Sequence, residues 1–258
     1  MVPDGSPALR AAFIALAAVV AAALVWAVAR AGRALGEEPR EARRAAALAA
    51  AGIALWLAFT GGLAARGFLA FEPQPTMLPL VAIALAGALA AGFSRAGARL
   101  VRGLPLAALV GYQGFRIPVE ALLARGHAEG LVPVQMTWHG MNFDVLTGVL
   151  ALLIAALSRL GPVPRWLVAA WNLIGFGLLT NVVALALLSA PTPMRVFWSE
   201  PANVWITRFP FVWLPAFLVP VALLGHLLVL RWLFEHPRGQ GPGAATAAGS
   251  PRAAAAGR

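Results

Sequence analysis

The residues best suited to chemistry lie in one otherwise apolar segment near the middle of the chain. Tyr112 and Gln113 precede Arg116 by four and three residues, and Glu120 follows it by four. On a helix these spacings place all four side chains on one face. A guanidinium in hydrocarbon costs from about 2.5 kcal/mol to much more, so Arg116 should face other helices and have an acidic partner. Glu120 is the nearest candidate.

This pair has two interpretations. A neutralised Arg116–Glu120 pair could simply fix the packing of helices. Alternatively, Arg116 could contact an anionic solute, with Glu120 as its charge partner or as a proton acceptor. Ionisable groups inside a membrane are functional by default, which keeps the second interpretation open. The side chains expected to bind such a solute are Arg116, Glu120, Gln135, Asn142, Asp144 and Asn203.

A second polar group follows in the segment RGHAEGLVPVQMTWHGMNFD, residues 125–144. His127, His139 and Asp144 are residue types that bind zinc and other divalent metals, and a bound metal could activate water. His139 and Asp144 are five residues apart across a glycine, so they do not form a helical ligand pair. Asp144 could equally stabilise the start of the following helix. A divalent metal is therefore the one cofactor considered, and no other is expected.

Proline and histidine mark the last apolar segment. Pro210, Pro215 and Pro220 recur every five residues and predict a kinked helix with freed carbonyl groups. His226 lies further along the same segment, where a hydrogen-bonded packing role is expected. Asn172, in the preceding apolar segment, is expected to hydrogen-bond between helices.

These residues sit in a chain that is too apolar for a soluble protein. Of its 258 residues, 60% are hydrophobic and 12% are charged, whereas soluble domains carry about 25% charged residues. Mean hydropathy is +0.79. The sequence predicts an all-α bundle of seven transmembrane helices in domain 1–235, followed by a disordered Gly/Ala/Pro-rich tail over 236–258. The predicted spans cover about 9–29, 45–65, 77–93, 104–124, 143–160, 166–188 and 209–233.

The arginines set the predicted orientation. All 20 basic residues are arginine, and with an extracytoplasmic N-terminus fourteen of them fall on the cytoplasmic side and five on the outer side. The first apolar segment precedes its positive charges, which favours a retained helix over a cleaved signal peptide. Because the arginines lie between spans, nucleic-acid binding is not expected, and the lipid bilayer is the expected partner.

Two residue types are missing. The chain has no cysteine, which excludes disulfides and thiolate chemistry, and no lysine, which excludes a retinal Schiff base. The arginine bias with abundant alanine, glycine and proline is typical of a GC-rich bacterial genome, so we expect a bacterial inner-membrane protein.

Several strings in the second half resemble a group of uncharacterised bacterial integral membrane proteins. They are FRIPVE (115–120), GLVPVQMTWHGMNFDVLTG (130–148), SAPTP (189–193) and PANVWITRFPFVWLPAFLVPVALLGH (201–226). The resemblance implies a polytopic membrane protein and no particular activity.

Three hypotheses follow for function. The first is a protein that binds or transports a small polar or anionic solute through a pocket facing the extracytoplasmic side. The second is a metal-assisted membrane enzyme, and the third is a non-catalytic sensor or assembly subunit.

Overall fold

The computed structural model describes residues 4–236, and within this range the chain is helical and contains no strand. The predicted all-α class is confirmed. The predicted disordered tail lies outside the described residues, apart from His236.

The elements are α1 (Pro7–Ala34), α2 (Pro39–Ala65), α3 (Met77–Phe93), α4 (Arg95–Gly103), α5 (Leu106–Gly111), η1 (Tyr112–Phe115), α6 (Arg116–Ala128), η2 (Val134–Met136), α7 (Val145–Leu160), α8 (Arg165–Leu188), η3 (Trp205–Thr207), η4 (Leu214–Leu218) and α9 (Val219–Glu235).

Several of these helices are suited to a membrane. In the described chain, α1, α2, α8 and the helix Leu214–Glu235 are each long and apolar enough to cross a bilayer. α3 and α4, which meet at an angle of 59°, make a fifth if the bent pair is counted as one span. Large apolar side chains project outward from these helices, among them Leu55 and Leu173, whose exposed fractions are 73% and 75%. Such exposure is unfavourable in water and natural in lipid.

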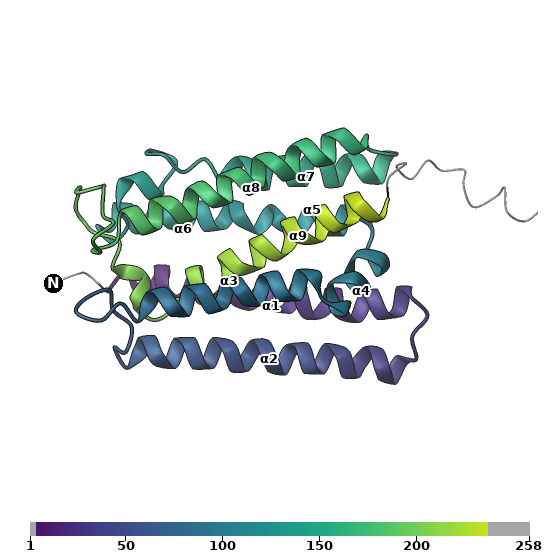
Figure 1. Cartoon of the computed structure of the whole chain (residues 1–258), viewed down its shortest axis with the longest axis horizontal. Coiled ribbons are helices and arrows are strands. Elements are labelled where there is room, and N and C mark those ends of the chain that lie inside the picture. The colour runs from purple at the N-terminus through teal and green to yellow at the C-terminus, as the bar shows by residue number, and fades with distance from the viewer. Residues whose placement is uncertain (1–3, 237–258) are drawn as a thin grey trace, which may run out of the picture.

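The helices run along a common long axis, and α9 lies between two groups of them (Figure 1). α5 to α8 lie on one side of α9, and α1 to α3 lie on the other. α9 is accordingly buried along most of its length, unlike α1 and α2. Side chains of α9 therefore take part in the core from both sides.

The predicted fourth span is helical but irregular. The chain leaves an extended conformation at Pro105 and then keeps right-handed helical dihedral angles through Gly111, Tyr112, Phe115 and Arg116. η1 is a 3₁₀ turn inside this helical segment, so α5, η1 and α6 form one continuous path over residues 106–128. The tighter 3₁₀ winding changes which residues share a face, compared with a regular α-helix.

One predicted loop is a helix. The basic segment after the third span was expected to be a connection, but it forms α4. Ser94 begins this helix by accepting a hydrogen bond from the Gly97 N–H with its hydroxyl, at 3.1 Å. Arg99 ties α4 to the loop between α1 and α2 through Glu37, with Nε 2.5 Å from Oε1. This ion pair is long-range in sequence, which is why local patterning did not indicate it.

The last span begins with a π-helix, η4, rather than a simple proline kink. Pro220 has no N–H to donate to the carbonyl group of Ala216. The indole of Trp56 donates to that oxygen instead, at 2.8 Å. A carbonyl group that the sequence left available to a ligand is thus satisfied by a side chain of α2.

Candidate functional site

The polar core is built on an ion pair between Arg116, at the start of α6, and Asp144, at the N-terminus of α7. Arg116 Nε lies 2.5 Å from Asp144 Oδ2, and Nη2 lies 2.5 Å from Oδ1. Both residues are buried, with exposed fractions of 2% and 6%. The structure therefore pairs Arg116 with Asp144 and not with Glu120, as the spacing on one helix had suggested. The contact from Nε is a charge-assisted hydrogen bond, whereas Nη2 is close to Oδ1 but is buried without a hydrogen-bond partner.

His226 of α9 extends this pair toward α8. Its Nε2 lies 2.8 Å from Nη1 of Arg116, and its Nδ1 lies 3.0 Å from Oδ1 of Asn172. Because a guanidinium can only donate, Nε2 must accept and Nδ1 must carry the proton. Asn172 therefore fixes the tautomer, and the imidazole is neutral in this arrangement. His226 and Asn172 were predicted to have packing and hydrogen-bonding roles, and the structure joins them.

Glu120 lies beside the pair and has a different partner. Its Oε1 accepts a hydrogen bond from Asn142 Nδ2 at 2.7 Å, while its Oε2 is buried and has no hydrogen-bond partner. Asn142 also accepts from the Asp144 N–H with Oδ1, at 3.0 Å. One amide side chain thus links the Glu120 carboxyl group to the backbone of Asp144. Asn142 and Glu120 are both fully buried.

The charges in this cluster do not balance. Within residues 4–236, the buried charged side chains are Arg116, Glu120 and Asp144. Arg116 supplies one positive charge, the two carboxylates supply two negative charges, and His226 is neutral. Arg116 Nε and Nη1 contact Asp144 and His226, and Nη2, which has no hydrogen-bond partner, lies 2.5 Å from Asp144 Oδ1. One negative charge, on a carboxyl group with an unpartnered oxygen, is left to be balanced by a proton or a bound cation.

A small cavity adjoins this carboxyl group. It measures about 20 Å³ and is lined by Glu120, Arg116, Asp144 and apolar side chains. A cavity of about 10–15 Å³ on this measure holds one water molecule. The space is therefore sufficient for one water or one small ion.

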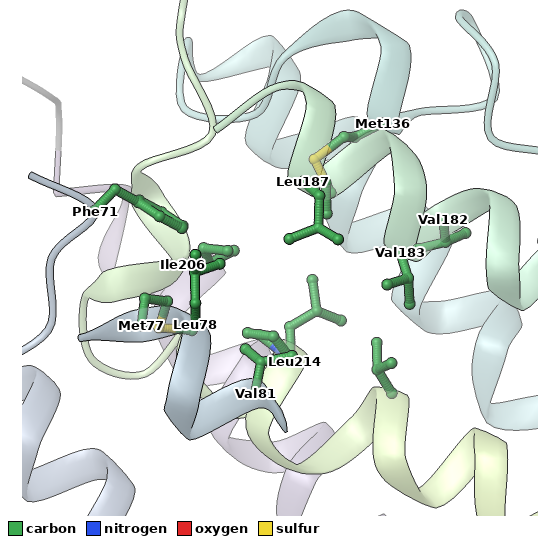
Figure 2. Close-up of a pocket in the computed structure, with 13 residues that line it drawn as sticks. Phe71, Met77, Leu78, Val81, Met136, Val182, Val183, Leu187, Ile206 and Leu214 are labelled. Carbon is green, nitrogen blue, oxygen red and sulfur yellow. The ribbon is translucent and has the colours of Figure 1, made fainter. Parts of the chain in front are cut away.

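Figure 2 shows a larger, apolar chamber. The chamber measures about 60 Å³ and lies between α3, α8 and the start of the last span, with Phe71, Leu78, Val183 and Leu187 among its walls. It shares lining residues with the small cavity, namely Val182, Leu214 and Val219. These three side chains therefore border both spaces.

Gly175 allows α8 to approach this cluster. A Cβ atom at this position would lie 2.6 Å from His226 Cε1 and 2.6 Å from Thr147 Cγ2. Thr147 itself donates to Asp144 Oδ1 at 3.3 Å. Sequence analysis did not single out Thr147 or Gly175. Neither carries a local signal, because their importance comes only from the packing of α7, α8 and α9.

Two predicted site residues lie apart from this cluster. Gln135 donates to the Ser189 hydroxyl at 2.8 Å, and Asn203 donates to the Ala186 carbonyl group at 2.9 Å. The Asn203 N–H also donates to the Ser189 carbonyl group, at 2.9 Å. Gln135 therefore ties the connection before α7 to the end of α8, and Asn203 holds the connection after α8 against the last turn of that helix. The oxygens of both amides are buried without a partner.

The three predicted metal ligands are not brought together. His127 Nδ1 lies 2.8 Å from the Val132 carbonyl oxygen, and His139 Nε2 accepts from the Trp138 indole at 2.9 Å. Asp144 is engaged by Arg116. In the part of the chain that the structure describes, no group of three or more histidine or acidic residues could hold a metal ion.

Glu129, at the end of α6, anchors the start of α1. It accepts from the Ser6 N–H, the Ser6 hydroxyl and Arg125 Nε, each at 2.7 Å. The hydrogen bond from the Ser6 backbone, with the contributions of the hydroxyl and of Arg125, lowers the pKa of Glu129 below its ordinary value. This contact fixes α1 against the helix that carries Arg116 and Glu120.

Comparison with known proteins gives one match. A model of a domain family of unknown function, DUF8737, matches residues 73–234. The chain belongs to this family. The matched region begins just before α3 and includes every residue of the cluster around Arg116, whereas α1 and α2 lie outside it. No curated protein and no solved structure matches the chain.

Proposed function

We propose that this chain is a multi-pass protein of the bacterial cytoplasmic membrane that binds or transports a small cation, the proton included, at Glu120. The supporting observation is the buried Oε2 of Glu120, which has no hydrogen-bond partner and belongs to a residue lining a cavity of about 20 Å³. A buried carboxylate without a partner is costly, and a proton or a cation removes that cost.

The arrangement favours a cation over the anionic solute expected from the sequence. An anion would need Arg116, but its guanidinium is engaged by Asp144 and His226. Binding an anion at Arg116 would break the buried pair of Arg116 with Asp144. It would also add a negative charge to a cluster that already contains the carboxyl groups of Glu120 and Asp144. A cation needs neither change, because it neutralises the charge already in excess.

Seven spans with an outer N-terminus are the proposed topology. To the four helices that suffice alone, it adds α3, the continuous helical segment 106–128 and α7. At 1.5 Å per residue these segments measure roughly 25, 35 and 24 Å, against about 30 Å of hydrocarbon. The bias of arginine toward one side supports the orientation.

This topology gives the solute a route from the outer side. The apolar chamber of Figure 2 involves the first turns of α3 and the last turns of α8, which both face outward in the proposed orientation. Val182, Leu214 and Val219 border both the chamber and the small cavity, so a path between the two spaces would open by movement of these side chains.

A thermal-shift panel on the purified protein tests the proposal. Alkali cations, small amines and anions are compared at constant ionic strength, with wild type, Glu120→Gln and the surface control Glu235→Gln. We expect a cation to raise the Tm of wild type and of the control but not of Glu120→Gln. Stabilisation by an anion that survives Glu120→Gln would contradict the proposal.

The orientation has its own test because the chain has no cysteine. Single cysteines at Gln74 and at Leu35 replace exposed residues in the loops at opposite ends of the bundle. In intact cells, an impermeant thiol reagent should label Gln74→Cys and spare Leu35→Cys. The reverse pattern would overturn the proposed orientation without bearing on Glu120.

A further inference from the structure

A second site lies at the opposite end of the bundle from the chamber. It is a groove of about 310 Å³ between α1, the α4–α5 corner, α7 and α9. Its walls are almost wholly apolar and include Leu24, Trp26, Ala107 and Ala155. It shares no lining residue with the cavity at Glu120. Small alanine side chains on α5 and α7 leave this space open.

The groove has one charged residue, Arg159. Arg159 is in the last turn of α7, one helical turn beyond Ala155 and two beyond Leu152, so the three lie along one face. It is exposed, and within residues 4–236 it makes no ion pair or side-chain hydrogen bond. A single cation therefore lies among the walls of an otherwise apolar groove.

A comparison within the molecule shows that this combination is specific. Another groove, of about 340 Å³, lies between α2, α3 and α9 and includes Ile53, Gly87 and Leu224. It has no charged residue among its walls. These two grooves are of similar size, and Arg159 adds a free guanidinium to the first of them.

We infer that the groove at Arg159 binds an anionic phospholipid, with an acyl chain along the apolar walls and the headgroup phosphate at Arg159. Apolar walls with one cation at the helix end match a molecule that has one anionic group and a long hydrocarbon chain. Basic pockets between transmembrane helices on the cytoplasmic side bind such headgroups. The end of α7 lies on that side in the proposed topology, and Trp26 has the amphipathic ring typical of the membrane interface.

Native mass spectrometry of the detergent-purified protein tests this inference. Phosphatidylglycerol and phosphatidylcholine with identical acyl chains are titrated against wild type, Arg159→Gln and the control Arg43→Gln. Arg43 is exposed on α2 and lies outside the groove. The attraction of one arginine to an anionic headgroup, about 1 kcal/mol, corresponds to about a fivefold change in lipid affinity. We expect Arg159→Gln to weaken phosphatidylglycerol binding about fivefold and to leave phosphatidylcholine binding nearly unchanged. Arg43→Gln should leave the binding of both lipids nearly unchanged.

A second pair of variants tests the position of the acyl chain. Ala23→Trp fills the groove from an exposed position on α1, whereas Gly87→Trp fills the uncharged groove, where nothing lies within 4 Å of an added Cβ. Ala23→Trp should reduce phosphatidylglycerol binding, and Gly87→Trp should not. Equal effects of the two tryptophans, or of the two arginine substitutions, would overturn the inference. So would inorganic phosphate that displaces the lipid, because the site would then recognise phosphate alone.

Discussion

Removing Arg116 should cost far more stability than removing Arg116 and Asp144 together. Both side chains are buried and meet at two points, each at 2.5 Å. Loss of one partner from a buried pair costs about 3–5 kcal/mol because the other charge is left uncompensated, whereas replacing both is often nearly neutral. In Arg116→Gln, two carboxyl groups, Asp144 and Glu120, lose their cation. In Asp144→Asn, Glu120 still offers Arg116 an opposite charge.

The expected order follows from this geometry. Arg116→Gln should lower the free energy of unfolding by about 3–5 kcal/mol, and Asp144→Asn should lower it less. The double variant should be more stable than Arg116→Gln alone. The assay is reversible unfolding in mixed micelles, followed by tryptophan fluorescence. Arg231→Gln is the control for loss of a guanidinium near the surface, because Arg231 pairs with Glu235 and donates to the Ser94 carbonyl group, and it should cost less than Arg116→Gln.

The double-mutant cycle also shows what would refute this reasoning. If the two single substitutions each cost under about 1 kcal/mol, the pair is not desolvated as described. If their costs simply add in the double variant, the two side chains do not interact. Either result would contradict the presence of a buried, interacting ion pair beside Glu120.

Three further predictions concern the elements around the cluster. Gly175→Ala should destabilise the protein by about 1–3 kcal/mol, because the added methyl group would push on His226. Gly177→Ala is the control on the same helix, because an added Cβ there meets nothing within 4 Å, and it should not destabilise the protein. Equal thermal unfolding of the two variants would contradict this prediction. Trp56→Phe should cost about 1–3 kcal/mol in the same assay, because the Ala216 carbonyl group loses its donor. Because the pKa of Glu129 is lowered in the folded state, its contribution is complete above its ordinary value of 4.5 and is lost as pH falls through the lowered pKa. The amide protection factors at the start of α1, which are corrected for the pH dependence of intrinsic exchange, should therefore fall in acid in wild type, and a Glu129→Gln variant should show no such loss.

The sequence predicted the apolar architecture well where periodicity and length are strong. Residues 77–93 coincide with α3, and the C-terminal ends of α2 and α8 agree with the predicted spans, although α2 begins six residues before its predicted span. The failures have physical reasons. The segment after α3 is polar enough to resemble a loop, yet α4 forms because it is held by Ser94 and by the Arg99–Glu37 pair. Within 104–124, a 3₁₀ turn replaced the regular helix that the spacing argument assumed.

The site was predicted in its residue types more than in its pairings. A buried arginine must have an acidic partner, and this expectation is met. Spacing on one helix indicated Glu120, but the partner is Asp144, which is 28 residues away and reaches Arg116 only through the packing of α7 on α6. The link from His226 to Asn172 spans 54 residues in the same way. Such pairings are tertiary, and no local pattern in one sequence specifies them.

The proposed function requires Glu120 to accept the proton or cation that balances the buried cluster. Infrared difference spectroscopy of the carboxyl C=O band measures this directly in the intact protein, during titration with pH and with the cation identified by thermal shift. The account predicts a band change in wild type and in Glu235→Gln that is absent from Glu120→Gln. An identical band change in Glu120→Gln would contradict the account, because the responding carboxyl group would then be another one.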